Sequence, residues 1–367
     1  MVRSGNVCRR TRRHARPWAS GRTRCDSERS EGTAVDVAIV GATGAVGETI
    51  VRVLEERGVP VGRLTPFATS GRRNAVMFRG AALDVRATTA EALSPYDVVF
   101  FAGGEDASER YAPRLLERGC VVIDNSATFR LRDDVPLIVP EVNAGALRAG
   151  HRLFPVANCT AILLCAALAP IRETAGLRCV RVATYQAASG AGRAGLDELR
   201  AGERAVALGG DEPDPAAFVR PLARNVIPQV GAIDSSGFTS EENKIRDETR
   251  KMLDIADLPV SALAVRVPVR TAHSLAIFVQ TLHATTVDAL AAAFERAPGI
   301  TYHRDGIVTP REVEGTDQVH VARLRTELGT ASDEFALWCV GDQLRKGAAT
   351  NAVQILELLL QRGYVRA

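Results

Sequence analysis

Along the first third of the chain, the pattern of apolar and polar residues alternates between short apolar runs, typical of buried strands, and the spacing of amphipathic helices. Residues 35–40 form a short apolar run rich in β-branched side chains, which predicts a buried strand. The run leads into the glycine-rich segment GATGAVG at residues 41–47, and residues 48–54 then have the apolar spacing of a helix. This order of strand, glycine turn and helix predicts the first unit of a parallel sheet.

The same alternation continues beyond this unit. Apolar strands are expected at residues 63–68, 98–101 and 121–123, with a helix at 109–118 between the last two. Strands that alternate with helices are typical of a doubly wound parallel sheet. The sequence therefore predicts an α/β protein with a Rossmann-type dinucleotide-binding domain. The small residues 102–104 end one strand, at the edge where such sheets place their ligands.

The glycine turn is a candidate phosphate site. Gly41 permits a tight turn, Gly44 lets a pyrophosphate approach the backbone, and Gly47 lets the helix pack on the strand. The spacing GxxGxxG is one residue off the commonest pattern, and a plain strand-to-helix connection is the alternative. The candidate cofactor-binding positions of this segment are Gly41, Thr43, Gly44, Ala45, Val46 and Gly47.

The end of the second strand indicates which dinucleotide is bound. NAD-specific sites usually place an acidic residue there to hold the ribose 2′-hydroxyl. This chain instead has Thr69, Ser70, Arg72 and Arg73. A hydroxyl and two guanidinium groups suit a 2′-phosphate, so NADP is favoured over NAD. The alternative is a solvated basic loop.

Cys159 is a candidate nucleophile. It follows a strand-like segment at 153–156 and precedes the apolar, helix-forming residues 161–171. We therefore expect it at a helix N-terminus, where the helix dipole and free backbone N–H groups favour a thiolate and stabilise an oxyanion. A cysteine in such a position is also common as a small buried apolar residue.

His273 is the histidine with the most suggestive surroundings among the six in the chain. It closes the segment RVPVRTAH, which begins at Arg266. An arginine and an imidazole at the two ends of one short segment suit a carboxylate ligand and proton exchange with a thiol. A structural histidine is the alternative.

Charge is distributed unevenly along the chain. Residues 1–33 contain nine arginines and three acidic residues, a net charge of +6 within a total of +3, so the remainder carries −3. We expect this segment to be a disordered Arg-rich tail; a transit peptide and a nucleic-acid-binding arm are the alternatives. The acidic remainder predicts no nucleic-acid partner.

The remaining composition excludes other classes of protein. No apolar run reaches the roughly 18 residues of a membrane helix, so we expect a soluble protein without a membrane partner. The seven cysteines have no paired spacing, which predicts neither a metal site nor a disulfide framework. A cytoplasmic location follows as an expectation.

Nine segments occur in a fixed order from residue 35 to the C-terminus. They are GATGAVG, NSATFR, PEVN, PVANCT, TYQAASGAG, NVIPQVG, TSEENKIRDETRKML, VRVPVRTAHS and GDQLRKGAATNAVQI. With these segments the chain resembles the aspartate-semialdehyde dehydrogenases.

The resemblance implies a reaction and a set of residues. The reaction is the reversible conversion of L-aspartate 4-semialdehyde, phosphate and NADP⁺ into 4-aspartyl phosphate and NADPH through a cysteine thioester, in lysine, threonine, methionine and diaminopimelate biosynthesis. Cys159 is implied as nucleophile, His273 as acid/base and Gln186 as the residue that orients the substrate. The implied substrate-binding residues are Arg266 for the carboxylate, Glu241 for the amino group, Lys244 and Arg130 for phosphate, and Asn158 beside the nucleophile. The implied cofactor site also includes Ser189, Gly190 and Gln343.

The pair Glu241 and Lys244 has a second interpretation. The two residues are three apart on a predicted helix at 241–253, so they share a face. Without the resemblance, a surface salt bridge is the simpler expectation.

Three positions depart from the family pattern. Gln343 stands where the family usually has Asn, Ala272 stands where TGHS has Gly, and Thr69 stands at the usual arginine position of the cofactor loop. The longer amide is expected to disturb a contact to the nicotinamide carboxamide, and the extra methyl lies beside the proposed base. Arg72 or Arg73 compensates for Thr69 if the cofactor is NADP.

The pattern and the resemblance together predict the domain organisation. Residues 35–158 are expected to form the NADP-binding domain and residues 159–344 an α+β catalytic and dimerisation domain. The helical segment 346–362 is expected to pack back on the first domain. A homodimer is implied by the resemblance alone.

Three alternatives stay open. An N-acetyl-γ-glutamyl-phosphate reductase-like enzyme shares the fold and the thioester chemistry, although Glu241 favours a free ammonium over an acylated amine. A glyceraldehyde-type phosphorylating dehydrogenase is less consistent with the EENK helix. A catalytically impaired NADP-binding paralogue is the other class of answer, motivated by Gln343 and Ala272 and opposed by the retained candidate residues.

Overall fold

The computed structural model describes residues 34–68, 75–327 and 333–365. The candidate positions Thr69, Ser70, Arg72 and Arg73, and the Arg-rich segment 1–33, lie outside these ranges. Among the described residues, no helix is both long and apolar enough to span a bilayer.

The first sheet is parallel throughout, in the order β5-β2-β1-β6-β7-β8. Its strands are β1 (Val35–Val40), β2 (Val61–Ala68), β5 (Arg86–Ala87), β6 (Val98–Phe101), β7 (Val121–Asp124) and β8 (Leu153–Pro155). A small antiparallel pair, β3 (Val76–Phe78) and β4 (Ala81–Leu83), lies beside it. The predicted doubly wound sheet is confirmed.

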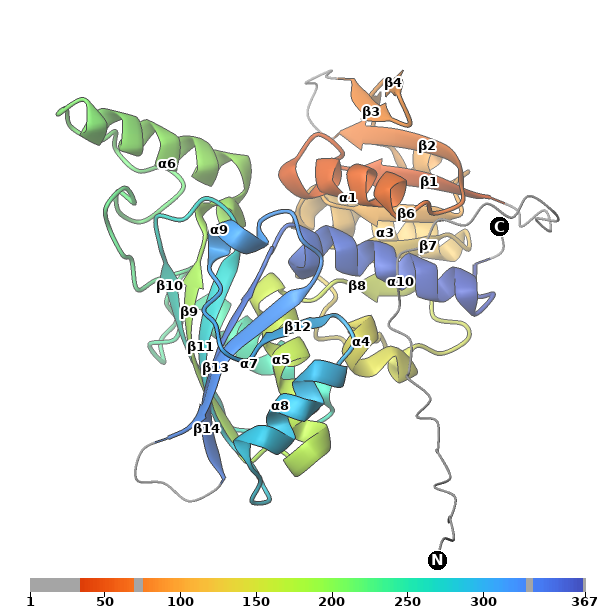
Figure 1. The fold of residues 1–367 in the computed structure, drawn as a ribbon. Coiled ribbons are helices and arrows are strands. Elements are labelled where there is room, and N and C mark those ends of the chain that lie inside the picture. Colours follow the sequence, from red (N-terminus) through yellow and green to blue (C-terminus); the bar gives the residue numbers. More distant parts are fainter. Residues whose placement is uncertain (1–33, 69–74, 328–332, 366–367) are drawn as a thin grey trace, which may run out of the picture. The chain divides into compact units, whose positions relative to one another are not determined.

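Both faces of this sheet are covered because its strands are apolar on both sides. Val37 and Ile39 of β1 belong to the core cluster that includes α1 (Ala45–Glu56) and α10 (Thr350–Gln361). Ala38 and Val40 belong to the cluster that includes α3 (Glu105–Glu117). Figure 1 shows α10 lying beside α1, and the two helices are in contact. The short helix α2 (Ala90–Leu93) contacts α3.

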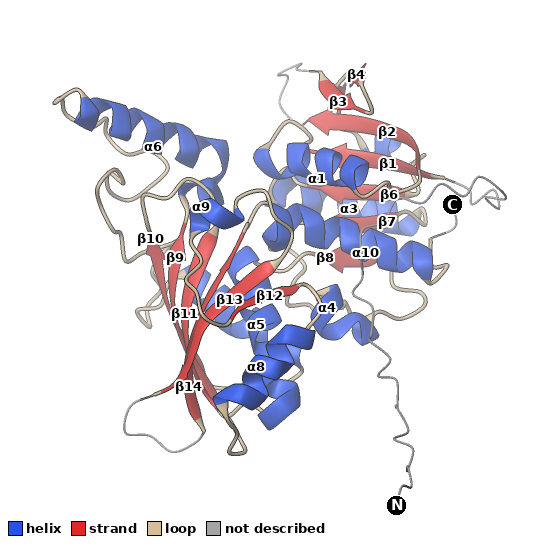
Figure 2. Ribbon diagram, viewed as in Figure 1, coloured by secondary structure: helices blue, strands red, loops and turns tan. Residues whose placement is uncertain are grey.

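The second sheet is mixed, in the order β10-β9-β11-β14-β13-β12. Its strands are β9 (Cys179–Gln186), β10 (Val260–Arg266), β11 (His273–Gln280), β12 (Ile300–His303), β13 (Val319–Thr326) and β14 (Glu334–Gly341). Helices α5 (Cys159–Ala175), α7 (Ser240–Leu253) and α8 (Val287–Arg296) contact it. Figure 2 shows α5 and α8 beside this sheet. The remaining segments are α4 (Pro140–Asn143), η1 (Ala144–Ala146), η2 (Ala188–Ala191), α6 (Gly192–Ala207) and α9 (Pro310–Val313).

The other face of the second sheet is partly apolar and exposed. On β9 the buried residues alternate with outward-facing ones, so Tyr185 is 38% exposed. Leu263 of β10 and Phe278 of β11 are 52% and 38% exposed. Trp338 of β14 packs against Tyr185 with ring centroids 5.6 Å apart. These four residues are called the aromatic face below.

The segment that precedes α10 differs from the prediction of one continuous helix from residue 346. Residues Arg345–Ala349 form a π-turn, in which Gly347 N–H bonds to Asp342 O and Ala349 N–H bonds to Leu344 O. Such turns are rare in proteins overall, and those that occur are often found at functional sites.

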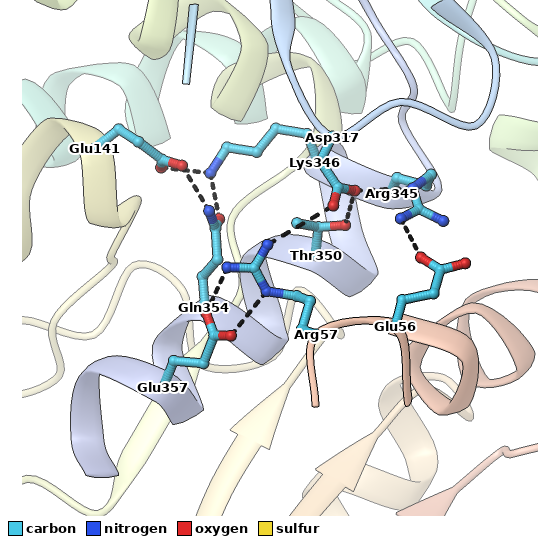
Figure 3. Close-up of polar contacts among 9 residues, drawn as sticks. All are labelled: Glu56, Arg57, Glu141, Asp317, Arg345, Lys346, Thr350, Gln354 and Glu357. Atoms are coloured by element: carbon cyan, nitrogen blue, oxygen red, sulfur yellow. Dashed lines mark hydrogen bonds and ion pairs between the residues drawn. The ribbon is translucent and has the colours of Figure 1, made fainter. Parts of the chain in front are cut away.

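Two buried cations hold this turn in place (Figure 3). Lys346, 1% exposed, donates to Glu141 of α4 and to Gln354 of α10. Arg345 donates to Glu56 of α1 at 2.6 Å and to Asp317 at 2.8 Å. The turn is therefore tied to α1, α4 and α10 at once.

Candidate active site

The glycine turn has the geometry of a phosphate cradle. Gly41 has a φ of +81°, and a Cβ there would lie 2.6 Å from backbone atoms of Ala102 and Gly103. A Cβ on Gly47 would lie 2.2 Å from Gly41 O. Helix α1 can therefore approach the end of β1 only because residue 47 has no side chain. Gly44 is the N-cap of α1 and makes no side-chain cap bond, which leaves backbone N–H groups for an anion. These observations fit a dinucleotide pyrophosphate.

One cavity of about 540 Å³ joins this turn to the candidate catalytic residues. Among the sequence-predicted positions it is lined by Gly44, Ala45, Val46, Arg130, Asn158, Cys159, Gln186, Ser189, Gly190, Glu241, Lys244, Arg266, His273 and Gln343. Gly41, Thr43 and Gly47 shape the turn but do not line the cavity. Residues from seven separate parts of the sequence thus meet at one place.

Cys159 is the first residue of α5, as its sequence position predicts. The helix is capped by Asn158, whose Oδ1 accepts the N–H groups of Thr160 and Ala161 at 3.0 and 3.1 Å. The expected thiolate is not favoured by these protein groups, however. Burial, and then the carboxylate of Glu241, raise the pKa of Cys159 to about 12. Thr160, Arg130 and Arg266 act in the opposite direction but do not outweigh them.

Glu241 organises the side chains next to the thiol. Its Oε1 accepts one hydrogen bond from Asn158 Nδ2 at 2.9 Å and another from Gln186 Nε2 at 3.0 Å. Gln186 Nε2 also donates to Thr160 Oγ1 at 2.8 Å. No ion pair between Glu241 and Lys244 occurs within the described residues, so the surface salt bridge is not found. Both side chains line the cavity instead.

His273 lies at the start of β11 with its ring fully buried. Its Nδ1 accepts the N–H of Ala187 at 3.1 Å, so the neutral ring carries its proton on Nε2. Burial, reinforced by Arg266, lowers the pKa of His273 well below its usual value, which keeps the ring neutral. Nε2 has no partner among the described protein groups. The ring is therefore a hydrogen-bond donor available to a ligand in the cavity.

Arg266 and His273 converge on Gly190. A Cβ on Gly190 would lie 2.7 Å from Arg266 Nη1 and 3.1 Å from His273 Nε2. Arg266 is held by Ala187 O, to which Nη1 donates at 2.6 Å, and its guanidinium lies 5.5 Å from the ring centre of Phe218. A glycine at this point lets a cation and an imidazole share one corner of the cavity.

Arg130 has one N–H group, at Nε, that is free to bind an anion. Its Nη1 pairs with Glu248 Oε1 at 3.1 Å and its Nη2 donates to Asn125 O at 2.9 Å. Its Nε is buried without a partner among the described protein groups. A buried guanidinium N–H without such a partner suits a phosphate oxygen, and Lys244 lines the same cavity.

Comparison with known proteins connects this cavity to a family. Residues 36–149 match the semialdehyde dehydrogenase NAD binding domain, and residues 168–346 match the semialdehyde dehydrogenase dimerisation domain. The aspartate-semialdehyde dehydrogenase of Aquifex aeolicus is 38% identical over 337 residues, which cover 90% of this chain and 99% of that protein. That of Bacillus subtilis is 37% identical over 343 residues, covering 89% and 98%. This chain belongs to the aspartate-semialdehyde dehydrogenase family.

Solved structures of the family share the fold. Aspartate semialdehyde dehydrogenase II from Vibrio cholerae superposes with a TM-score of 0.85 at 37% identity, over 90% of this chain and 99% of that one. The same enzyme complexed with ASA gives the same values. The resemblance inferred from the nine sequence segments, and the α/β fold with a dinucleotide-binding domain, are therefore confirmed.

Two residues at the site of this family member were missed by sequence reasoning. Glu248, 1% exposed, pairs with Arg130 and accepts the backbone N–H of Asn158, so one carboxylate contacts both the phosphate candidate and the nucleophile's cap. Its spacing from Glu241 and Lys244, at seven and four residues, was the available signal. Gly347 of the π-turn lies against the candidate nucleophile, since a Cβ there would be 2.9 Å from Cys159 Cβ.

Proposed function

We propose that this protein is an NADP-dependent aspartate-semialdehyde dehydrogenase that converts 4-aspartyl phosphate reversibly into L-aspartate 4-semialdehyde and phosphate. The observation that carries the proposal is the single cavity in which Cys159, His273, Arg266 and Glu241 meet the glycine turn. Family membership and the V. cholerae structure with ASA support the substrate.

The charges of the cavity suit an amino acid with a reactive aldehyde. Arg266 provides a buried cation for the substrate carboxylate, and Glu241 provides an anion for its ammonium group. An N-acetylated substrate has no ammonium, so it would leave Glu241 facing a neutral amide. The free amino acid is therefore favoured over the N-acetyl analogue.

The thiol of Cys159 performs the covalent chemistry in this proposal. The S–H bond breaks as the sulfur adds to the aldehyde carbon, its proton passing to solvent, and the resulting oxyanion accepts a hydrogen bond from His273 Nε2–H. The oxyanion re-forms a carbonyl as hydride leaves, which gives a thioester on Cys159. A phosphate held by Arg130 and Lys244 then attacks the thioester carbon, so that acyl phosphate forms and the thiolate is released.

The cofactor would occupy the glycine turn with its pyrophosphate and would accept the hydride on its nicotinamide ring. Ala45 and Val46 at the start of α1 offer backbone N–H groups to the pyrophosphate. Ser189, Gly190 and Gln343 line the part of the cavity next to His273. The choice of NADP rests on the sequence of Thr69, Ser70, Arg72 and Arg73, which provides cations for a 2′-phosphate.

A homodimer formed through the second sheet completes the proposal. The dimerisation domain that this chain matches contains β9, β10, β11 and β14. The aromatic face on these strands exposes apolar side chains together, which is typical of a surface that is covered in an assembly.

The test is an assay of NADPH and NADH formation with aspartate semialdehyde in the presence and absence of phosphate. We expect phosphate-dependent activity with preference for NADP, and a loss of about 10⁴-fold or more in Cys159→Ala. Cys179→Ala, a cysteine outside the cavity, is the matched control and should retain activity. Equal or better turnover of the N-acetylated semialdehyde, or comparable activity in Cys159→Ala, would overturn the proposal.

A further inference from the structure

The two departures from the family pattern in the catalytic half contact each other. Ala272, which replaces the usual glycine before the histidine, has a φ of +71° and a fully buried side chain. Its backbone N–H donates to Oε1 of Gln343, which replaces the usual asparagine, at 2.7 Å. A left-handed conformation is unfavourable for alanine and is kept only where the surroundings hold it. The Gln343 side chain is one of the groups that hold it.

The turn at Ala272 leads directly into His273 at the start of β11. His273 follows Ala272 directly and pairs with Gly341 at the start of β11, two residues before Gln343. On its other side the ring is fixed by Ala187 N–H, which bonds to Nδ1 at 3.1 Å. The backbone on both sides of the imidazole is thus restrained.

The amide of Gln343 joins both restraints. While its Oε1 accepts from Ala272, its Nε2 donates to Ser189 Oγ in η2, the short helix that follows Ala187. Ser189 N–H in turn donates to Arg270 O at 3.1 Å, in the segment that leads to Ala272. Gln343 is 2% exposed, so these bonds form away from bulk water.

We propose that Gln343 is a positioning residue whose side chain holds the left-handed turn at Ala272 and thereby directs His273 Nε2 into the cavity. This inference rests on the role proposed for His273 above. It differs from the expectation that the longer amide merely disturbs a cofactor contact, because the carbonyl of Gln343 is used within the protein.

The geometry predicts that the two positions are coupled. An asparagine at 343 is shorter by one methylene, so its oxygen cannot reach the Ala272 N–H, and the strained turn loses its restraint. A glycine at 272 adopts positive φ without strain and does not need the restraint. The damage from Gln343→Asn should therefore be repaired by Ala272→Gly.

The test is a double-mutant cycle with Gln343→Asn, Ala272→Gly and both together. We expect Gln343→Asn to lower kcat about 10- to 100-fold with a smaller change in the KM for the semialdehyde, since a misdirected catalytic group affects the reaction step. Ala272→Gly alone should stay within about threefold of wild type, and the double variant should recover most of the kcat that Gln343→Asn loses. Gln361→Asn shortens an exposed amide by the same methylene and serves as the control.

A second readout does not depend on turnover. In the protein without cofactor, ¹⁵N spectra of histidine side chains, with His273→Asn for assignment, should show His273 as a single Nε2–H tautomer. Gln343→Asn should give a mixture of tautomers, and the double variant should restore the single form. Because the spectra are recorded without substrate, they test the position of the His273 ring even if the protein acts on a different aldehyde.

Two results would overturn the inference. Additive losses, with the double variant more than tenfold below Ala272→Gly, would show that the positions act independently. An unchanged His273 spectrum in Gln343→Asn would show that the amide does not position the ring. If Gln343→Asn alone folds poorly, the kcat of the double variant is compared with that of Ala272→Gly. A double variant more than tenfold lower still overturns the inference.

Discussion

Residues 44–46 of the glycine turn and the side chains around Cys159 line one cavity, yet the two regions are formed by different parts of the chain, backbone in one and side chains in the other. The turn is made by backbone, and its geometry depends on positions where a Cβ would meet another backbone atom at 2.2 to 2.6 Å. The catalytic half is made by side chains, in which one oxygen of Glu241 accepts hydrogen bonds from the side-chain amides of both Asn158 and Gln186. These side chains come from segments far apart in the sequence.

This difference decides how each region responds to change. A backbone cradle should tolerate side-chain changes that keep its glycines and its backbone N–H groups, because the cradle itself is formed by backbone atoms. A buried hydrogen-bond network transmits the loss of one member to its neighbours, since each remaining group is left without a partner in a medium of low dielectric. The predictions that follow test this contrast, from the largest expected effect to the smallest.

The thiol of Cys159 should be unreactive in the absence of substrate and cofactor. Its pKa is raised to about 12, and a group with a raised pKa stays protonated below it. At pH 7 we expect alkylation by iodoacetamide to be about 10³-fold slower than for a free cysteine, and to rise about tenfold per pH unit up to pH 11. The measurement is the rate of Cys159 labelling by mass spectrometry. A rate that reaches a plateau near pH 7 would contradict the dominance of burial.

The ion pair of Lys346 and Glu141 should stabilise the π-turn next to Cys159. Lys346→Met leaves a buried carboxylate unpaired, so we expect the free energy of unfolding to fall by about 3 kcal/mol or more. Adding Glu141→Gln, which keeps an acceptor for Gln354, should recover about half of this loss. Arg63→Met, in a pair with side chains 51% and 34% exposed, should cost less than about 1 kcal/mol. Urea unfolding measures all four proteins, and equal losses for Lys346→Met and Arg63→Met would exclude the role.

The cradle should fail at the glycine where backbone contact is closest. Gly47→Ala places a Cβ 2.2 Å from Gly41 O, so we expect about 2 kcal/mol of destabilisation and at least tenfold weaker NADP binding. Gly145→Ala, where nothing lies within 4 Å of the added Cβ, is the control. Calorimetric titration gives the affinities. Unchanged binding by Gly47→Ala would show that the turn does not hold the cofactor.

Glu248 should affect both turnover and the use of phosphate. Glu248→Gln keeps an acceptor for Asn158 N–H but removes the charge opposite Arg130, so we predict a kcat about tenfold lower and a raised KM for phosphate. Asp247→Asn alters a carboxylate 31% exposed on the same helix and should change neither constant. Steady-state kinetics with varied phosphate separates the two. A raised KM for the semialdehyde alone would assign Glu248 elsewhere.

The sequence allowed the local features of the fold to be predicted, with small errors at element ends. The strand at 35–40, the glycine turn and the helix that begins at Cys159 depend on short-range periodicity and capping, which a single sequence records. The helix predicted at 109–118 begins earlier, at Glu105, because Gly104 with a φ of +96° ends the preceding segment.

Features that depend on distant partners could not be predicted in this way. The π-turn at Arg345–Ala349 is tied to carboxylates at residues 56, 141 and 317, which no local pattern connects to it. Glu248 acts on Asn158, 90 positions away. The raised pKa of Cys159 follows from burial and from Glu241, whereas the helix start alone predicted the opposite direction. The candidate residues of the site were identified by the family resemblance, because hydrophobic periodicity does not indicate which distant residues lie close in the fold.

The most direct test of the central claim is the first turnover in the absence of phosphate. Wild-type enzyme mixed rapidly with L-aspartate semialdehyde and NADP⁺ should release a burst of about one NADPH per active site and then stop, with an acyl group on Cys159 detected by mass spectrometry. Addition of phosphate should start continuous turnover. Steady NADPH formation without phosphate, or a burst that leaves no adduct on Cys159, would contradict the thioester mechanism.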